Sequence, residues 1–390
     1  MNILLVSDTY KPQINGLVTA LEIQRRSLKL KLNNITLLVP KLKKYKDKDI
    51  FTIPVLPNPL FSEYKIPSLF SLKNLYKIRK LKIDIIHTHT PFQLGTYAIM
   101  LSRILKIPIV HTYHTYFEEY MHYVKIPKKP GKIIVQLYSK WYCNQMDHVI
   151  APSSFMKKVL QSYNIESDIS VVPSGYDLAA FKIKKSMDWR KKLRIPEKAK
   201  VLLYVGRIAK EKNLYFLIDV FKKLFVSITK QAKHNNLYMI LTGSGPEFQP
   251  LLKYIKKNNL SRYIKMTGFV EYKKIHGIYK TGDLFVFPSK TETQGLVLIE
   301  AMLNNLPIIS FYERGTKAVL PVKKSLGISP VKRDTDFIKE LTFYLKEDFS
   351  RSELVKNISN YVKKFDNRII INDLILLYKK IIKRYQVHNK

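Results

Sequence analysis

Short runs of β-branched and other apolar residues recur along the chain, each followed by a polar turn and a longer amphipathic stretch. Near-continuous apolar runs of this kind are typical of parallel strands that helices cover on both faces. In the N-terminal part the runs are Ile3–Val6, Ile35–Val39, Ile83–His87, Ile107–Thr112, Val149–Ala151 and Ile169–Val172. A second series comprises Val201–Val205, Tyr238–Thr242, Ile264–Thr267, Leu284–Phe287 and Pro307–Ser310. The pattern predicts an α/β protein with two doubly wound, Rossmann-like parallel sheets.

A polar, lysine-rich stretch separates the two series and indicates a domain boundary. We expect a first domain over 1–175, a linker region over 176–198 and a second domain over 199–369. Two parallel sheets side by side place a ligand cleft where the carboxyl ends of their strands face each other.

The last amphipathic segment is predicted to be a packing helix. Residues 372–385 carry apolar side chains at helical spacing, namely Leu374, Leu377, Tyr378 and Ile381. We expect residues 370–390 to join the first domain.

Composition and length agree with two folded cores and place the chain among cytoplasmic proteins. The 390 residues are 46% hydrophobic, enough for two domains. No stretch of about 18 apolar residues lacks a charge, and Met1 leads directly into an apolar strand. One cysteine, Cys143, excludes an internal disulfide and fits a reducing compartment.

The chain is strongly basic, with 68 Lys and Arg against 30 Asp and Glu and a net charge of +38. Such a charge favours an acidic partner, which can be a nucleic acid, an anionic membrane surface or a phosphorylated ligand. Basic residues occur in both halves. The sequence lacks the RNA-binding, helix-turn-helix and zinc signatures of nucleic-acid-binding proteins. A basic nucleic-acid-binding protein is therefore a distant alternative, and we expect no nucleic acid partner.

Candidate phosphate-binding residues follow the first strand of each domain. After the first, Gly16 shapes a loop, and the following helix start favours a phosphate, although a plain tight turn is an alternative. After the strand at 201–205, the segment YVGRIAKEKNL supplies Arg207 and Lys212. Breaking a sugar–nucleotide bond leaves negative charge on the diphosphate, which fixed Arg and Lys donors stabilise.

The segment FVFPSKTETQGLVLIEAM places Glu292 in a loop and Glu300 in the helix that follows. The spacing alone is uninformative, because 30 acidic residues in 390 produce roughly two such pairs by chance. Gly295 frees the backbone at the helix start, where its own amide and those of Leu296 and Val297 point at an anion. Glu292 is suited to sugar hydroxyls and Glu300 to ribose hydroxyls.

Further residues of the same helix define its sides. Leu296, Ile299 and Leu303 predict an apolar side, with Glu300 one turn in from the helix start. The alternative is a solvated Glu300 and a Glu292 that the helix dipole favours.

These segments resemble the E-x7-E signature and accompanying motifs of retaining GT-B glycosyltransferases of family 4. PQINGLVTAL, VVPSGYD, YVGRIAKEKNL, LTGSGPE, TGFV and GDLFVFPS occur in the family's order. The resemblance implies a GT-B fold, a nucleotide-sugar donor, anomeric retention and no obligatory metal or other cofactor. It also implies that Glu292 and Glu300 grip sugar and ribose, that Arg207 and Lys212 grip the diphosphate, and that Phe269–Val270 lie near the base. Asn304–Asn305 depart from the family pattern.

Five of the nine histidines fall between 87 and 122. The two-residue period of a strand puts His87 and His89 on one face, an arrangement that can supply two ligands to a zinc ion. No cysteine joins the group, and two of the histidines lie within apolar strands. We therefore expect no metal site.

The segments IIHTHTPFQLG, IVHTYHTYFEEY and ETQGLVLIEAM are similar to those of bacterial 1,2-diacylglycerol 3-glucosyltransferases. This similarity implies that a UDP-sugar, with glucose as the hexose, is the co-substrate and diacylglycerol the acceptor. His114 would lie against the donor sugar, and Glu118 or Glu119 near the acceptor hydroxyl. Another lipid or a polysaccharide remains an alternative acceptor.

A lipid acceptor requires contact with a membrane, and residues 68–82 are the predicted contact. Lys73, Lys77 and Lys80 share one side of a helical wheel, and Leu72, Leu75, Ile78 and Leu81 occupy the opposite arc. One interpretation is an interfacial helix attracted to anionic lipid. The alternative is an ordinary helix that covers the sheet. The first predicts a peripheral protein on the cytoplasmic membrane face.

Overall fold

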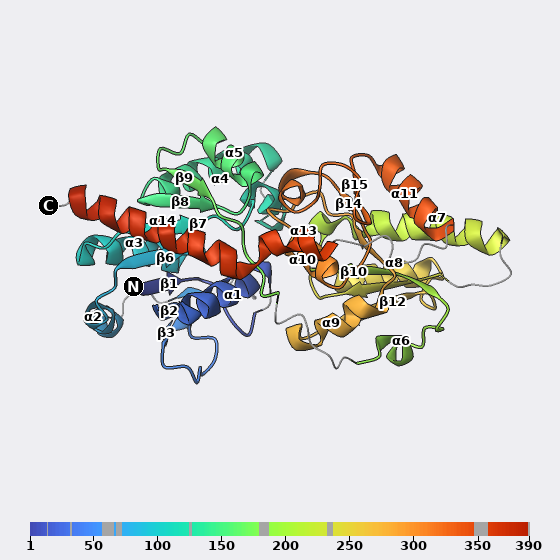
Figure 1. Ribbon diagram of the computed structural model, residues 1–390, viewed down its shortest axis with the longest axis horizontal. Coiled ribbons are helices and arrows are strands. Elements are labelled where there is room, and N and C mark those ends of the chain that lie inside the picture. The colour runs from blue at the N-terminus through green and yellow to red at the C-terminus, as the bar shows by residue number, and fades with distance from the viewer. Residues whose placement is uncertain are drawn as a thin grey trace. The chain divides into compact units, whose positions relative to one another are not determined.

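Two parallel sheets organise the chain, as the pattern of apolar runs predicts (Figure 1). The computed structural model describes residues 1–13, 15–31, 33–56, 66–67, 72–124, 127–178, 187–231, 237–346 and 358–388. One compact unit consists of residues 1–177 and 365–390, and the other of residues 178–364. The fold class predicted from the sequence is confirmed.

The sheet of the first unit has seven strands in the order β3-β2-β1-β6-β7-β8-β9, all parallel. They are β1 (Asn2–Val6), β2 (Asn34–Pro40), β3 (Ile50–Ile53), β6 (Ile85–Thr88), β7 (Ile109–Thr112), β8 (His148–Ala151) and β9 (Ile169–Val171). A short antiparallel pair, β4 (Val55–Leu56) and β5 (Ile66–Pro67), lies outside this sheet.

Helices cover both faces of the first sheet. They are α1 (Gly16–Leu30), α2 (Leu72–Lys80), α3 (Gln93–Leu105), the 3-10 helix η1 (Phe117–Val124), α4 (Lys128–Cys143), α5 (Ser154–Ser162) and α14 (Asn367–His388). The side chain of Asn15 accepts a hydrogen bond from the Val18 amide, which caps α1 at its start. Strand residues alternate between two cores, so that Leu4 and Ile86 enter one and Ile3 and Leu5 enter the other.

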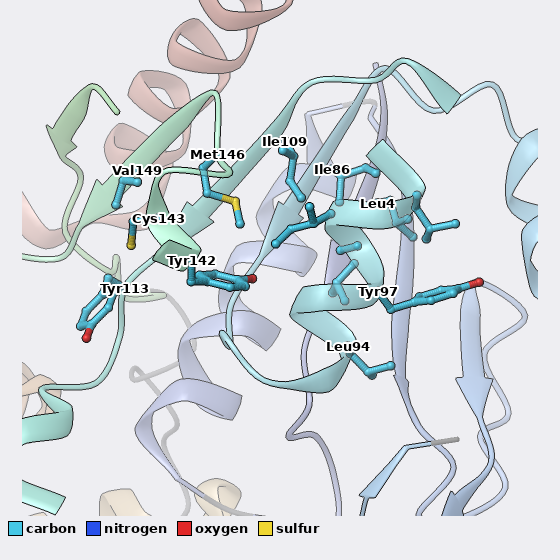
Figure 2. Close-up of a cluster of buried hydrophobic side chains, with 14 of the residues drawn as sticks. Leu4, Ile86, Leu94, Tyr97, Ile109, Tyr113, Tyr142, Cys143, Met146 and Val149 are labelled. Carbon is cyan, nitrogen blue, oxygen red and sulfur yellow. The ribbon is translucent and has the colours of Figure 1, made fainter. Parts of the chain in front are cut away.

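The first of these cores, shown in Figure 2, contains Tyr97 of α3 and Tyr142 and Cys143 of α4. Burial raises the pKa of the Cys143 thiol to about 12, so it is an inert packing group at neutral pH. The second core lies under α1 and α14. Ile371, Leu374, Tyr378 and Ile381 of α14 are buried there, which confirms the predicted packing helix.

The sheet of the second unit has six parallel strands in the order β12-β11-β10-β13-β14-β15. They are β10 (Lys200–Val205), β11 (Leu237–Thr242), β12 (Ile264–Gly268), β13 (Leu284–Phe287), β14 (Ile308–Phe311) and β15 (Ile328–Val331). The helices are α6 (Trp189–Lys192), η2 (Lys210–Lys212), α7 (Leu214–Gln231), α8 (Phe248–Lys257), α9 (Tyr272–Thr281), α10 (Leu296–Leu303), η3 (Arg314–Ala318), α11 (Asp334–Lys346) and α13 (Ile358–Val362), with η4 (Lys363–Phe365) at the unit boundary.

Part of the predicted linker region is folded. Residues 189–192 form α6, which packs on α9 and buries Trp189. Within the predicted linker, residues 179–186 lie outside the described residues. Among the helices of the described ranges, none has both the length and the apolar character that crossing a bilayer requires.

The predicted membrane helix is in large part a covering helix. Ile78 of α2 is fully buried, and Leu75 and Leu81 pack against the same core. The interfacial interpretation is therefore wrong for Leu75, Ile78 and Leu81, because these side chains face the sheet. The side chain of Leu72 and residues 68–71 lie outside the described residues. Lys77 and Lys80 are exposed, whereas the side chain of Lys73 lies outside the described residues.

Candidate functional site

The order of each sheet places its ligand-binding edge. In both units the strand order reverses beside the first strand, between β1 and β6 and between β10 and β13. Ligands of doubly wound sheets bind at the carboxyl ends of the strands at such a reversal. Gly16 follows β1, Arg207 follows β10, and Glu292 follows β13.

An ion pair joins two of the predicted donor residues in the second unit. The Lys212 ammonium lies 2.5 Å from Oε1 of Glu292, and both side chains are mostly buried. The hydroxyl of Ser289 donates to the same carboxylate oxygen at 2.7 Å. The tertiary structure thus brings together residues that are 80 positions apart in the sequence.

The loop that carries Glu292 is fixed by a neighbour that the sequence did not suggest. The amide of Gly315 in η3 donates to the Glu292 carbonyl at 2.9 Å. A Cβ atom at Gly315 would lie 2.1 Å from the carbonyl carbon of Thr293, so only glycine permits this approach. In the sequence, the signal for this contact is the RGT segment after β14, which contains Gly315.

Gly295 starts helix α10 in the left-handed conformation, with φ of 86°. This backbone geometry favours glycine and agrees with its predicted role. Of the predicted apolar side of α10, Ile299 is fully buried, whereas Leu296 and Leu303 are half-buried. Leu298, Ala301 and Met302 are buried as well. The helix is enclosed on several sides, since it packs on β14 and on α13.

Glu300 is buried in this helix, with 7% of its surface exposed. The hydroxyl of Tyr279 donates to its Oε2 at 2.6 Å, which provides a partner for the carboxylate. Burial, and then the charge of Glu300, raises the pKa of Tyr279 well above its ordinary value. The solvated alternative for Glu300 is therefore excluded.

The departure from the family pattern at Asn304–Asn305 shapes the end of α10. The side-chain amide of Asn304 donates to the Glu300 carbonyl at 2.8 Å. Asn305 has φ of 52°, a left-handed conformation that asparagine tolerates better than most residues. These asparagines therefore shape the end of the helix.

The remaining residues that the sequence predicts to bind the donor follow β10 and β12 at the same edge of the sheet. Arg207 is half-buried, and its carbonyl accepts a hydrogen bond from the Tyr204 hydroxyl at 2.9 Å. Phe269 and Val270 follow β12, where Val270 is buried and Phe269 is exposed. An exposed aromatic ring at a strand end is suited to stacking on a base.

In the first unit, Gly16 is the first residue of α1 rather than a loop residue before it. Within the described residues, a Cβ atom built on Gly16 meets no atom within 4 Å. Internal packing of the described part therefore gives no reason for the glycine.

Four histidines gather at the carboxyl ends of β6 and β7. The rings of His87 and His89 are 4.2 Å apart between centroids, which confirms that they share a face. Nδ1 of His89 lies 2.9 Å from Nε2 of His114, so the two rings share one proton. Nδ1 of His111 lies 2.8 Å from the Thr88 hydroxyl. The side chain of His122 lies outside the described residues.

Burial controls the charge of this cluster. It lowers the pKa of His114 to about 4 and that of His111 to about 3. The pKa values of His87 and His89 also lie well below the ordinary value, for the same reason. A small cavity of about 30 Å³ is lined by Gln24, His87, Thr112 and His114, among others. The cluster is neutral at neutral pH, and within the described residues no group of three or more His, Cys, Asp or Glu is arranged to hold a metal.

The two acceptor candidates, Glu118 and Glu119, lie in η1. The carboxylate of Glu118 accepts hydrogen bonds from the hydroxyls of Tyr116 at 2.9 Å and Tyr163 at 2.8 Å. It also lies 3.7 Å from the Lys132 ammonium of α4. These contacts tie η1 to α4 and α5, which favours a structural role for Glu118. Glu119 is half-buried in the same helix.

Asp8 follows the carboxyl end of β1, and the sequence pattern alone gave no reason to single it out. Its Oδ1 accepts from the Leu94 amide at 2.7 Å, and its Oδ2 accepts from the Thr90 hydroxyl at 2.6 Å. It thereby supplies the acceptor that Phe92, at the start of α3, lacks. Burial raises the pKa of Asp8 to about 6.

The chain matches two family models in succession. Glycosyltransferase Family 4 matches residues 14–180, and Glycosyl transferases group 1 matches residues 185–365. Two parallel Rossmann-like sheets with these matches define an enzyme, a glycosyltransferase of the GT-B class. The chain belongs to the family 4 glycosyltransferases, which confirms the resemblance seen in its motifs.

Curated relatives and solved structures agree with this family. The chain is 29% identical over 322 residues to an alpha-monoglucosyldiacylglycerol synthase of Streptococcus pneumoniae, over 80% of this chain and 71% of the relative. It is 27% identical to one of Acholeplasma laidlawii over 98% of both chains. In fold it is similar to a sucrose-phosphate synthase from Thermosynechococcus elongatus, with a TM-score of 0.76, 19% identity and coverage of 98% and 99%. Anabaena HepE in complex with UDP-glucose gives a TM-score of 0.74, 17% identity and coverage of 97% and 100%.

Proposed function

We propose that this enzyme transfers glucose from UDP-glucose to diacylglycerol at a membrane surface, with retention at the anomeric carbon. The observation that carries the acceptor is the similarity to two alpha-monoglucosyldiacylglycerol synthases, one of them along 98% of both chains. A fold neighbour in complex with UDP-glucose supports the donor. UDP-glucose is an α-glycoside, so an α-linked product corresponds to retention.

The diphosphate, sugar, ribose and base of the nucleotide-sugar donor each have a proposed binding residue in the second unit. Arg207 and Lys212 bind the diphosphate, together with the amides of Gly295, Leu296 and Val297 at the start of α10. Glu292 accepts hydrogen bonds from sugar hydroxyls and Glu300 from ribose hydroxyls. Phe269 and Val270 lie at the base.

The reaction breaks the bond between the anomeric carbon and the diphosphate oxygen, and forms one from that carbon to the acceptor hydroxyl oxygen. The acceptor proton is released, and UDP leaves with the additional negative charge. Arg207 and Lys212 stabilise this charge as it develops. His114, neutral at neutral pH, lies against the sugar. We assign neither glutamate as a nucleophile and expect turnover without added metal.

A donor and acceptor screen tests the proposal. Purified protein is incubated with UDP-glucose, UDP-galactose or GDP-mannose and vesicles that contain diacylglycerol, and the product mass is measured with and without EDTA. We expect a monohexosyl-diacylglycerol from UDP-glucose in both conditions. Turnover on a soluble sugar with no glycolipid would overturn the lipid acceptor.

Substitution of Glu292 tests the sugar contact. Glu292→Gln removes the charge that pairs with Lys212, and we expect turnover to fall at least 100-fold while UDP binding persists. Glu197→Gln is the matched control, because Glu197 is an exposed glutamate of the same unit. Unchanged turnover in Glu292→Gln would contradict the assignment.

A further inference from the structure

Helix α4 leaves an apolar stripe exposed on the first unit. We define the α4 face as Ile133, Ile134, Leu137, Tyr138 and Trp141, all of which are exposed. The opposite side of the helix, with Val135, Ser139 and Tyr142, is buried against the sheet. An ordinary covering helix turns its apolar side inward, whereas α4 has apolar residues on both sides. Its outer stripe therefore calls for a partner.

The charge of α4 indicates what that partner is. The helix carries four lysines and no acidic residue. Lys129 lies one turn before Ile133 on the same row, and Lys140 lies beside Leu137, so lysines border the apolar stripe. Lys129 and Lys132 are exposed, and Lys140 is partly so. An apolar stripe bordered by cations matches an anionic lipid surface.

The aromatic residues of the α4 face point to the same partner. Tyr138 and Trp141 have ring centroids 5.7 Å apart, and each ring presents an apolar body with a polar atom. Such rings concentrate at the boundary between lipid headgroups and acyl chains. Helix α2, the other basic helix of the unit, has its apolar side in the core and cannot insert it.

Contacts lead from the α4 face to the histidine cluster. The Tyr138 hydroxyl donates to the carbonyl of Pro91, next to the exposed Phe92. The ring of Phe92 lies 5.6 Å from that of Phe117, which lies 5.6 Å from that of Tyr113. Tyr113 precedes His114 in the chain. These aromatic contacts connect the α4 face with the residue that precedes His114.

From these observations we infer that the α4 face docks on an anionic lipid bilayer and inserts Ile133, Ile134, Leu137 and Trp141 into its headgroup region. The functional reason for this docking, access to a lipid acceptor, rests on the proposed function. The docking itself rests on the exposed side chains and on the lysines that border them.

The two tryptophans allow a direct measurement of insertion. Trp141 is 49% exposed and Trp189 is 5% exposed, so a Trp189→Phe variant reports Trp141 alone. With vesicles of equal parts phosphatidylcholine and phosphatidylglycerol, we expect a blue shift of its emission and quenching by lipids brominated on the acyl chain. Vesicles of phosphatidylcholine alone should bind less, because the lysines lack anionic partners. Bound vesicles with no shift and no quenching would overturn the inference.

A matched pair of leucines tests the surface. Leu137 is 65% exposed on α4, and Leu376 is 63% exposed on α14 of the same unit. We expect Leu137→Glu to weaken vesicle binding at least tenfold and Leu376→Glu to leave it unchanged, with equal melting temperatures for both. Equal vesicle binding by both variants would overturn the inference. So would a dimer that only Leu137→Glu dissociates while vesicle binding persists, because a second copy would then occupy the face.

The acceptor's physical form separates this inference from the proposed function. With dihexanoylglycerol in detergent micelles, Leu137→Glu should turn over like the unsubstituted protein, whereas with long-chain diacylglycerol in vesicles it should be at least tenfold slower. If the unsubstituted protein forms no glycolipid from either but still inserts Trp141, the proposed function fails and the docking stands. If it forms glycolipid while Leu137→Glu matches it on vesicles, the docking fails and the function stands.

Discussion

At the scale of single residues, the contact between His89 and His114 determines how the second ring is presented. Nδ1 of His89 lies 2.9 Å from Nε2 of His114. We expect His114→Ala to lower kcat at least 100-fold if the ring lies against the reacting sugar. His89→Ala should lower kcat less, because His89 acts by positioning His114.

Two amides test this positioning role. His89→Asn places an amide near the position of Nδ1 and should restore most of kcat, whereas His89→Gln places it near Nε2 and should not. Steady-state kinetics with varied UDP-glucose separates kcat from KM. If all three substitutions of His89 have the same kcat, the hydrogen bond to His114 has no catalytic part.

Glu300 provides a second prediction at this scale. Tyr279→Phe removes the 2.6 Å hydrogen bond to its buried carboxylate. Because a hydrogen bond to a charged group contributes about 1.5–3 kcal/mol, misplacing Glu300 should weaken UDP binding about tenfold or more. Calorimetric titration with UDP measures it. Tyr254→Phe is the control, since Tyr254 donates to Asp219 at 2.6 Å in the same unit. Equal affinities in the two variants would contradict a ribose contact at Glu300.

At the scale of elements, α14 stabilises the first unit by covering its second core. Leu374 is 4% exposed and Leu376 is 63% exposed on this helix. Leu374→Ala should lower the free energy of unfolding by about 2–4 kcal/mol, because it leaves a cavity. Leu376→Ala should change it by less than about 0.5 kcal/mol. Urea unfolding followed by circular dichroism measures both values, and similar losses would mean that α14 does not pack as described.

Central and edge strands differ in how well the sequence predicts them. The central strands were recognised because they are buried on both faces and read as continuous apolar runs. Of the four edge strands, β9 and β12 correspond to predicted runs, whereas β3 and β15 do not. β3 is mostly half-buried, and β15 contains Pro330, which central strands rarely tolerate. Partial burial in β3 and the proline in β15 interrupt the continuous apolar run that identifies a parallel strand, so the sequence does not predict these two strands.

At the scale of the whole molecule, the buried histidines make stability depend on pH. The pKa values of His87, His89, His111 and His114 lie below the ordinary value in the folded protein. The unfolded chain therefore binds more protons as the pH falls through about 6.5, and the free energy of unfolding decreases. Asp8, with its pKa raised to about 6, acts in the opposite direction between about pH 6 and 4. Burial also lowers the pKa of His148 and raises that of Asp147, so the histidines outnumber the two carboxyl groups and acid should destabilise the fold.

Urea titrations at pH 7.0 and 5.5 measure this dependence. We expect a loss of about 1 kcal/mol for each buried histidine over that interval. His111→Asn should reduce the loss of unfolding free energy between pH 7.0 and 5.5 by the contribution of one histidine. A free energy of unfolding that stays constant from pH 7.0 to 5.5 would show that these histidines have the same pKa in the folded protein as in the unfolded chain.

The amino-acid sequence by itself determined the two series of parallel strands and the order of the family motifs, and it suggested the donor residues that we propose. These follow from local information, because apolar runs, turn glycines and motif spacing are read over a few positions. The Lys212–Glu292 pair and the four-histidine cluster needed the tertiary structure, since distant strands bring their members together.

Only the tertiary structure decided which amphipathic helix keeps an apolar side exposed. A helical wheel shows that one side of α2 is apolar, but not what covers that side. Strands far away in the chain bury Ile78 of α2 and leave Leu137 of α4 outside. The proposed membrane contact is therefore placed on α4 and not on the segment at 68–82, because burial is a property of the packed sheet and not of the helix alone.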